Sequence, residues 1–437
     1  MNLNKRVKLS VGIKRWLLLG ILGLVMFSYG VSPIYVEINL FYNHIFKYLF
    51  FSILGVLLLY FSVKKSFKSF LQYYNVENID DKHDFKISDL FNSSMTKLED
   101  KNIKLFSKRK ALDKGPKIVV IGGGTGLSVL LRGLKKYTTN ITAIVTVADD
   151  GGGSGVLRED LGMLPPGDIR NCILALADTE PIMEKLLQYR FEDGKLKGQS
   201  FGNLFIAAMN GICGNFEIAI KEMSNVLAVT GKVLPMTLED VKLYAKLKNG
   251  KVIEGESNIP IENRKIGSEI DYVYIKPKES YPLKEAIEAI KEADCIVLGP
   301  GSLYTSVIPN LLVNGLSDAI YNSTAIKVYV ANVMTQPGET DGYNVLDHVN
   351  AIFKHSKDGL INYVIANKEE IPNKTLLKYY KDGAKPVVID EEQEQKLKAK
   401  GISVIKDNLV DIKKNYIRHD ALRVSKILID LILERNL

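Results

Sequence analysis

Two long apolar runs near the amino terminus stand apart from the rest of the chain. The first, residues 16–36, contains no charged side chain, and the second extends over about residues 41–63. At about 1.5 Å per residue in a helix, each run is long enough to cross a bilayer core of about 30 Å. We therefore predict a two-helix transmembrane hairpin in residues 1–63, with helices at about 16–36 and 41–63.

Basic side chains flank this hairpin on both sides. Lys14 and Arg15 precede the first run, Lys64 and Lys65 follow the second, and Glu37 lies in the connection. Because positive residues stay on the cytoplasmic side, the pattern predicts a two-pass protein of the cell membrane with its main domain in the cytoplasm. A cleaved signal peptide is the alternative. The length of the first run, the lack of a small-residue cleavage site and the second run argue against it.

The charge is divided unevenly along the chain. The formal net charge is +8, but residues 1–115 hold 18 Lys and Arg against 9 Asp and Glu, whereas the remainder holds 40 against 41. The main domain is therefore nearly neutral, and we expect no nucleic-acid partner. Residues 64–114 are predicted to be a polar cytoplasmic linker. Three widely spaced cysteines without a C-x-x-C pair indicate buried thiols in a reducing compartment.

After residue 115 the apolar pattern alternates between strands and helices. A strand at 117–121, a helix at 127–137 and a strand at 141–147 form a βαβ unit, which favours a parallel sheet. Asn249 and Gly250 predict a hairpin turn. We expect a doubly wound, mainly parallel, Rossmann-like α/β domain over residues 115–437 with an inserted β-hairpin. The hairpin strands are predicted at 241–247 and 251–255, further helices at 182–189, 203–212, 217–228, 283–293 and 421–433, and further strands at 295–298, 327–331, 363–365 and 387–389.

A glycine-rich turn joins the first strand to the first helix of this domain. Gly123, Gly124 and Gly126 lack a Cβ atom, and the N–H groups that open the helix after Thr125 carry the positive end of its dipole. This arrangement favours phosphate binding, although a purely structural turn is the alternative. Leu127 stands where a dinucleotide fingerprint needs glycine, and no Gly-Lys-Ser/Thr follows, so neither NAD nor ATP is specified.

The second strand is followed by another glycine cluster, residues 148–155. Asp149 and Asp150 suit Mg²⁺ or a ribose hydroxyl, and Gly152 and Ser154 allow a ligand to approach the backbone. A turn capped by Asp150 is the alternative interpretation.

Two helix starts carry further polar candidates. In the turn 164–171, Arg170 suits a phosphate and Asn171 lies beside it, while Asp168 is either a helix cap or a ligand contact. Asn203 either caps the next helix or contacts the edge of a base. These alternatives remain open at the level of sequence.

Two later strands end in similar loops. Gly299, Gly301, Ser302 and Thr305 repeat the sequence of strand, glycine turn and helix, and Tyr304 offers a ring for stacking and a phenol for hydrogen bonding. The loop 332–340 carries groups suited to sugar hydroxyls, and an ordinary loop is its alternative. Its candidates are Asn332, Thr335 and Gln336. Five such loops at one edge of a sheet predict a nucleotide-shaped crevice.

No hydrolytic apparatus is evident. The five histidines are scattered, and none stands in a metal-binding spacing or near a nucleophile elbow. His348 is interpreted as a capping or core residue. We therefore assign no catalytic residue.

The six loop motifs together resemble those of the bacterial gluconeogenesis-factor (YvcK) family, the UDP-sugar-binding relatives of 2-phospho-L-lactate transferase (CofD-like). The resemblance covers about residues 115–435. It implies a doubly wound α/β fold, binding of UDP-N-acetylglucosamine through Tyr304 among others, and a role in cell shape and cell-wall precursor balance during gluconeogenic growth. The motifs are GGGTGL at 122–127, DDGGGSG at 149–155, LPPGDIRN at 164–171, SFGNL at 200–204, LGPGSLYTSVIPNLL at 298–312 and NVMTQPGET at 332–340.

This sequence departs from the family pattern at two places. Gly153 stands where serine is common, and Gln199 stands where histidine is common. The second departure removes a histidine from that place and with it any histidine-dependent chemistry there.

Two classes of function follow. A regulatory sensor would bind the nucleotide sugar without turnover, whereas an Mg²⁺-dependent phosphotransferase would hold its metal at Asp149 or Asp150. The sensor is favoured because no base is evident, and an NAD-linked enzyme is a third, weaker interpretation. We expect a homo-oligomer with a UDP-sugar ligand, no further cofactor apart from Mg²⁺ in the transferase case, and cell-wall synthesis enzymes as partners.

Overall fold

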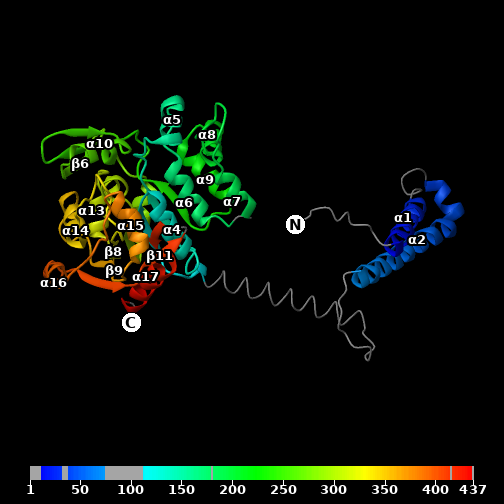
Figure 1. Ribbon diagram of the computed structural model, residues 1–437. Helices are drawn as coiled ribbons and strands as arrows, with labels where there is room; N and C mark the ends of the chain where they lie inside the picture. The colour runs from blue at the N-terminus through cyan, green and yellow to red at the C-terminus, as the bar shows by residue number, and fades with distance from the viewer. Residues whose placement is uncertain (1–10, 32–37, 74–111, 179–180, 414–415, 436–437) are drawn as a thin grey trace. The chain divides into compact units, whose positions relative to one another are not determined.

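The computed structural model describes residues 11–31, 38–73, 112–178, 181–413 and 416–435 (Figure 1). The chain divides into two compact units, Met1–Leu98 and Glu99–Leu437. Each unit is described by itself below.

The amino-terminal unit is a pair of helices, α1 (Val11–Val31) and α2 (Ile38–Tyr73). Glycines allow the two helices to approach closely, because a Cβ atom at Gly55 would lie 2.5 Å from the backbone nitrogen of Phe27. The Ser62 hydroxyl donates to the carbonyl of Trp16 at 2.5 Å. The predicted helical hairpin is thus present, and small residues at its interface explain the tight fit.

The predicted boundaries of these helices were inaccurate. α1 begins at Val11 rather than at residue 16, and residues 32–36 lie outside the described residues. α2 continues to Tyr73, beyond the predicted end at residue 63, because helical hydrogen bonding does not stop where the apolar run stops. The predicted polar linker therefore begins as helix, and its residues 74–111 lie outside the described residues.

One segment of this unit has the length and composition of a membrane span. Among the described residues, Lys47–Lys65 is long and apolar enough to cross a bilayer, with a mean hydropathy of 1.5 and only 11% of it buried. The apolar helix Leu18–Tyr29 is shorter. The second unit also contains an apolar helix pair, Phe201–Cys213 and Phe216–Val226, which is bent by 118°.

The second unit is built on a parallel sheet of seven strands in the order β10-β9-β8-β7-β1-β2-β3. The chain moves outward from β1 through β2 and β3, and then returns to β7 on the other side of β1. This reversal is the switch point of a doubly wound sheet, where ligands bind beyond the carboxyl ends of the strands. The strands are β1 (Ile118–Gly122), β2 (Ile141–Val145), β3 (Lys232–Pro235), β7 (Cys295–Leu298), β8 (Ile326–Val330), β9 (Tyr363–Asn367) and β10 (Ser403–Asp407).

Two smaller antiparallel sheets accompany it. The predicted hairpin at Asn249 and Gly250 is confirmed as β4 (Lys242–Leu247) and β5 (Val252–Glu254), and β6 (Ile270–Lys276) adds a third strand that was not predicted. A separate hairpin, β11 (Val410–Lys413) and β12 (Tyr416–His419), was also missed.

The strand predicted at 387–389 was wrong. Val387 is buried, but its N–H donates to the carbonyl of Val333 in the loop after β8, and Pro386 forms an isolated bridge with Met334. The apolar run therefore covers a loop instead of extending the sheet. The edge position belongs to β10.

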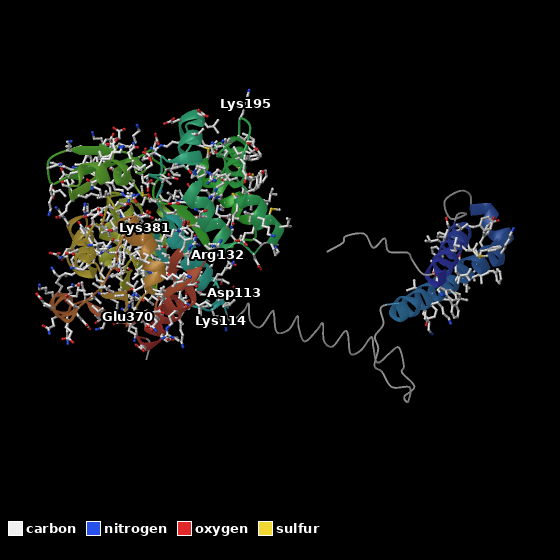
Figure 2. The ribbon with its side chains drawn as sticks, in the orientation of Figure 1. Asp113, Lys114, Arg132, Lys195, Glu370 and Lys381 are labelled. Atoms are coloured by element: carbon white, nitrogen blue, oxygen red, sulfur yellow. The ribbon has the colours of Figure 1, made fainter. Side chains whose placement is uncertain are left out.

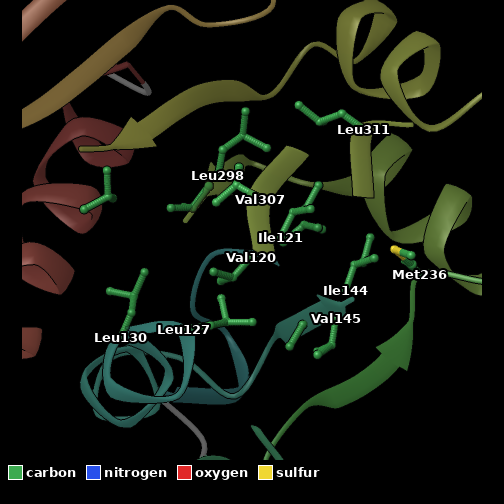
Figure 3. Close-up of a cluster of buried hydrophobic side chains, with 14 of the residues drawn as sticks. Val120, Ile121, Leu127, Leu130, Ile144, Val145, Met236, Leu298, Val307 and Leu311 are labelled. Atoms are coloured by element: carbon green, nitrogen blue, oxygen red, sulfur yellow. The ribbon is translucent and has the colours of Figure 1, made fainter. Parts of the chain in front are cut away.

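Two groups of helices cover the sheet. In the first group α4 packs beside α6 and α17, and in the second α11 packs beside α13. The βαβ spacing produces a continuous apolar core of strand and helix side chains such as Ile121, Leu127 and Leu298 (Figure 3). The helices are α4 (Gly124–Leu134), α5 (Gly152–Leu161), α6 (Gly167–Leu176), α7 (Pro181–Gln188), α8 (Phe201–Cys213), α9 (Phe216–Val226), α10 (Asn258–Ile266), α11 (Lys284–Glu292), the π-helix η2 (Leu303–Val307), α12 (Ile308–Leu311), α13 (Leu316–Asn322), α14 (Val345–Lys354), α15 (Asn373–Lys381), α16 (Glu391–Ala399) and α17 (Ala421–Arg435).

Candidate functional site

The two glycine turns at the switch point lie against each other. A Cβ atom at Gly126 would lie 2.7 Å from the carbonyl oxygen of Pro300, and one at Gly301 would lie 3.1 Å from the carbonyl oxygen of Gly123. Only glycine permits this approach, which explains why both strand ends carry the same turn. Gly299 has a φ of +78°, a conformation that side chains with a Cβ disfavour.

A cavity of about 330 Å³ opens between these turns, the loop after β8, helix α15 and the hairpin β11–β12. We call it the switch-point crevice. Six of the predicted ligand residues line it, and they are Thr125, Gly126, Gly301, Ser302, Asn332 and Gln336. The remaining lining residues are Val129, Pro300, Val333, Met334, Tyr379, Tyr416, Ile417, Arg418 and His419.

The aromatic wall of the crevice comes from α15 and β12, which the sequence analysis missed as sources of ligand contacts. The hydroxyl of Tyr379 accepts the backbone N–H of Ile417 at 2.7 Å, which fixes the helix to the hairpin. Tyr416 and Arg418 are two residues apart on β12, so their side chains leave the strand on the same face. That period-two pattern is the only signal the sequence offers for them.

His419 also lines the crevice. Its Nε2–H donates to the carbonyl of Ala331 at 2.9 Å, and burial lowers the pKa of the imidazole. The ring is therefore neutral at pH 7, and its Nδ1 is an acceptor.

The two polar atoms of the Gln336 side-chain amide differ in their hydrogen bonding. Its Nε2 donates to the Ser302 hydroxyl at 2.7 Å, while Oε1 is buried and has no hydrogen-bond partner among the described residues. A buried acceptor without a donor is costly, so a ligand that brings an N–H or O–H group to this oxygen would be favoured.

Gly123 and Gly124 lie behind the crevice and do not line it. The N–H of Gly124 donates to a carboxylate oxygen of Asp168 at 2.6 Å, and a Cβ atom at Gly123 would meet the same carboxylate. Asp168 is therefore neither a cap of its own helix, whose N-cap is Pro166, nor a crevice residue. It fixes the first glycine turn.

Arg170 and Asn171 line a second, smaller cavity of about 260 Å³, which we call the basic pocket. The Arg170 guanidinium donates to Asn203 Oδ1 at 2.9 Å and to Asn171 Oδ1 at 2.8 Å, and also to the Ser200 hydroxyl. Ser200 is the N-cap of α8, so Asn203 neither caps the helix nor lines a cavity, and it orients Arg170. The lining residues are Thr125, Ser128, Arg132, Arg170, Asn171, Leu174, Gln188 and Arg190.

Asp149 and Asp150 belong to an acidic cluster with Asp168, Glu256 and Glu339. Burial raises the pKa of Asp168 to about 6, of Glu339 to about 7 and of Glu256 to about 8. Neighbouring carboxylates add to the effect at Asp168 and Glu256, and burial also raises the pKa of Asp149. Glu256 and Glu339 were not predicted, because they reach the cluster from loops far apart in the sequence.

The acidic cluster does not fit a metal ion as it is arranged. Asp149 accepts the N–H of Gly151 and Asp150 accepts the N–H of Ser257, each at 2.9 Å, so each has one oxygen occupied by backbone. Across the described ranges, no three His, Cys, Asp or Glu side chains are placed to hold a metal together.

Gly152 and Ser154 lie in the first turn of α5, which replaces the predicted loop. The two departures from the family pattern meet here, because a Cβ atom at Gly153 would lie 2.7 Å from Oε1 of Gln199. The Gln199 side chain thus lies where a side chain at residue 153 would begin.

Three predicted ligand residues lie in the interior instead. Tyr304 is 2% exposed, and its hydroxyl is 2.8 Å from that of Tyr343. The Thr305 hydroxyl lies 3.4 Å from both carboxylate oxygens of Glu339, and the Thr335 N–H donates to the carbonyl of Lys385. The tyrosines that line the crevice are Tyr379 and Tyr416, whereas Tyr304 lines a separate cavity of about 380 Å³ together with Tyr343 and Asp341. Among the histidines, His348 is fully buried, as expected for a core residue.

The fold and the crevice define a Rossmann-like α/β protein whose binding surface lies at the switch point of a parallel sheet. The sequence profile of the 2-phospho-L-lactate transferase CofD family matches residues 118–410. Two relatives bear the name gluconeogenesis factor. The Bacillus subtilis protein is 51% identical over 73% of this chain and 99% of its own length, and the Halalkalibacterium halodurans protein is 50% identical over 72% and 97%. The chain belongs to the CofD-like family of gluconeogenesis factors.

Further comparisons agree with this assignment. A protein of Clostridium acetobutylicum is 49% identical over 99% of this chain and 92% of its own length, so the amino-terminal unit is matched as well. A crystal structure of a UPF0052 family member from Bacillus halodurans covers 71% of this chain and 98% of its own, with 51% identity and a TM-score of 0.68. The predicted family and fold class are therefore confirmed.

Proposed function

We propose that the switch-point crevice binds a UDP-sugar, with UDP-N-acetylglucosamine as the first candidate. The observation that carries the proposal is Gln336, which lines the crevice and whose buried Oε1 has no hydrogen-bond partner among the described residues. The N3–H of uracil would satisfy this acceptor, whereas the unprotonated N3 of cytosine would face it with a second lone pair. The resemblance to UDP-sugar-binding proteins points to the same base.

The rest of the crevice suits the other parts of such a ligand. Thr125 and Gly126 open α4, whose first-turn N–H groups have no intrahelical acceptor and attract the pyrophosphate. Tyr379 and Tyr416 offer ring surface to a base or sugar, and Arg418 adds positive charge beside them.

We further propose that the protein is a regulator that binds without turnover. The titratable side chains lining the crevice are Tyr379, Tyr416, Arg418 and His419. Burial lowers the pKa of His419, which makes its imidazole a weaker base. In this proposal, binding couples nucleotide-sugar supply to cell shape and to cell-wall precursor balance during gluconeogenic growth, through contacts with cell-wall synthesis enzymes and as a homo-oligomer.

Calorimetry on the full chain in detergent tests the ligand. We expect UDP-N-acetylglucosamine to bind more tightly than CDP-glucose, GDP or NAD. Gln336→Leu should weaken the UDP-sugar by about tenfold, as for one lost hydrogen bond in a buried site, and Gln393→Leu on α16 is the matched control. Tighter binding of CDP-glucose, GDP or NAD would refute the assignment.

An Mg²⁺-dependent phosphotransferase is the second candidate. The name of the matching family and the acidic cluster favour it, whereas the arrangement of that cluster does not. Steady release of UDP from the sugar nucleotide that requires Mg²⁺ and is lost in Asp150→Asn would establish turnover and displace the regulator.

We propose that residues 16–63 anchor the protein as a two-pass hairpin with the α/β unit in the cytoplasm. The exposed apolar surface of Lys47–Lys65 and the flanking basic residues support this. Protease added outside intact spheroplasts should leave the α/β unit uncut, and cleavage within it would reverse the topology.

A further inference from the structure

The basic pocket gathers three arginines from three parts of the fold. Arg132 comes from α4, Arg170 from α6, and Arg190 from the segment after α7, and none of the residues lining the pocket is acidic. Thr125 is the single residue that lines both this pocket and the switch-point crevice. The two cavities are therefore neighbours that meet at the start of α4.

The positive charge in the pocket is only partly balanced. Arg132 pairs with Glu184 at 3.2 Å, whereas Arg170 and Arg190 form no ion pair with any described residue. The pKa of Arg170 is lowered by burial and then by the nearby charge of Arg190, whereas the charges of Asp168 and Asp149 raise it. Arg170 and Arg190 therefore repel each other, and two carboxylates outside the pocket lining offset part of that repulsion. An anion bound between the two guanidinium groups would relieve this repulsion.

The Arg170 guanidinium is held in place by neutral groups. The side chains of Asn171, Asn203 and Ser200 accept its terminal N–H groups, and its Nε–H is buried without a described acceptor. Neutral acceptors fix the direction of the guanidinium and leave its charge available. This is the arrangement expected of an arginine that recognises a phosphate oxygen.

We propose that the basic pocket binds the phosphate group of a second ligand, a phosphomonoester, while the nucleotide occupies the crevice. The crevice has its own donors for a pyrophosphate at Thr125, Gly126 and Ser302. The pocket has no aromatic residue among those lining it, so it offers no stacking surface to a base, and its smaller volume suits a small phosphorylated metabolite. Thr125 places the two ligands side by side.

This inference does not require that the nucleotide is a UDP-sugar. It requires only that the pocket is filled independently of the crevice. The two proposals can therefore fail separately.

The test is calorimetry on the full chain in detergent, in a phosphate-free buffer at fixed ionic strength. Inorganic phosphate and glucose 6-phosphate are titrated with and without saturating UDP-N-acetylglucosamine. We expect both probes to bind in either condition. Arg190→Gln should raise both dissociation constants by about tenfold, as for one lost charge-assisted hydrogen bond.

Lys195→Gln is the matched control, because it removes one positive charge from the same segment. Figure 2 shows Lys195 pointing away from the α/β unit, and it is exposed and outside the pocket. Arg190 is also exposed, and its guanidinium donates to the carbonyl oxygen of Gly198, so thermal unfolding of Arg190→Gln is measured beside binding to show that the variant stays folded. Phosphate affinity should be unchanged in the control.

Three results would overturn the inference. They are displacement of phosphate by UDP-N-acetylglucosamine, an Arg190→Gln variant that binds phosphate as tightly as the parent, and binding of inorganic phosphate without glucose 6-phosphate. If both phosphate probes bind through Arg190 but UDP-N-acetylglucosamine does not bind at all, the proposed function fails and this inference stands.

Discussion

The switch-point crevice and the acidic cluster share one edge of the same sheet and have opposite chemistry. The crevice is lined by glycine turns, aromatic rings, amides and one arginine, and no carboxylate lines it. The acidic cluster consists of carboxyl groups whose pKa values are raised to about 6, 7 and 8 at Asp168, Glu339 and Glu256. The proposed ligand surface thus lies near a cluster of buried carboxyl groups.

The Gly124–Asp168 hydrogen bond joins the two regions, because the acidic cluster fixes the turn from which the crevice is built. The comparison teaches that polar residues following parallel strands need not form one site. Here they separate into the residues that line the switch-point crevice and a buried cluster that supports its first glycine turn. The predictions below test this separation.

The largest effect is expected for Gly126→Val. Its side chain would collide with the carbonyl of Pro300 and push the two glycine turns apart. We expect nucleotide binding to be abolished and the free energy of unfolding to fall by up to about 3 kcal/mol, as for an overpacked interior. Calorimetry and chemical denaturation measure the two effects. Gly211→Val on α8, where no atom lies within 4 Å of the new Cβ and the backbone is helical, should leave binding intact.

A smaller effect on binding is expected for Tyr379→Ala, which removes a ring from the crevice wall. We expect the nucleotide to bind less tightly by about 1–3 kcal/mol if the ring stacks on the base or sugar. Tyr379→Phe keeps the ring and loses only the hydrogen bond to Ile417. Equal losses in the two variants would mean that the hydroxyl, and not the ring, carries the effect.

The acidic cluster should make stability depend on pH. In the folded protein the pKa of Glu256 is raised from its ordinary 4.5 to about 8, so the folded state binds more protons than the unfolded state across that window. The stability that this proton provides is present below pH 4.5 and is lost as the pH rises to 8, with a slope of at most about 1.4 kcal/mol per pH unit.

Glu256→Gln should flatten this dependence between pH 5 and pH 8, and Glu262→Gln on the exposed side of α10 is its control. Denaturation at a series of pH values provides the measurement. An unchanged slope in Glu256→Gln would show that Glu256 is not the group that titrates.

The smallest effect is expected for Tyr304→Phe. This change removes the hydrogen bond to Tyr343 and keeps the buried ring, so the free energy of unfolding should fall by about 1 kcal/mol. Because Tyr304 lies outside the crevice, nucleotide affinity should not change. Weaker binding in this variant would mean that Tyr304 contributes to the ligand site.

Much of the fold could be predicted because its signals are local. The βαβ periodicity, the turn at Asn249 and Gly250 and the two glycine turns each depend on neighbours within a few residues, and the structure confirms them. The edge strand was misplaced because an apolar run such as 387–389 has the same composition in a strand and in a covering loop.

The sequence by itself determined the family, the parallel sheet and the edge at which polar loops gather. It also determined that Thr125, Gly126, Gly301 and Gln336 would lie together, because strands adjacent at a switch point end side by side.

Only the tertiary structure decided which polar residues face a cavity. It placed Tyr304 outside the switch-point crevice, assigned Asn203 to the support of Arg170, and brought Tyr379 and Tyr416 from the last 60 residues of the chain to the crevice wall. The physical reason is that side-chain direction depends on the helix start, the strand register and long-range packing. None of these is encoded within the few residues of a motif.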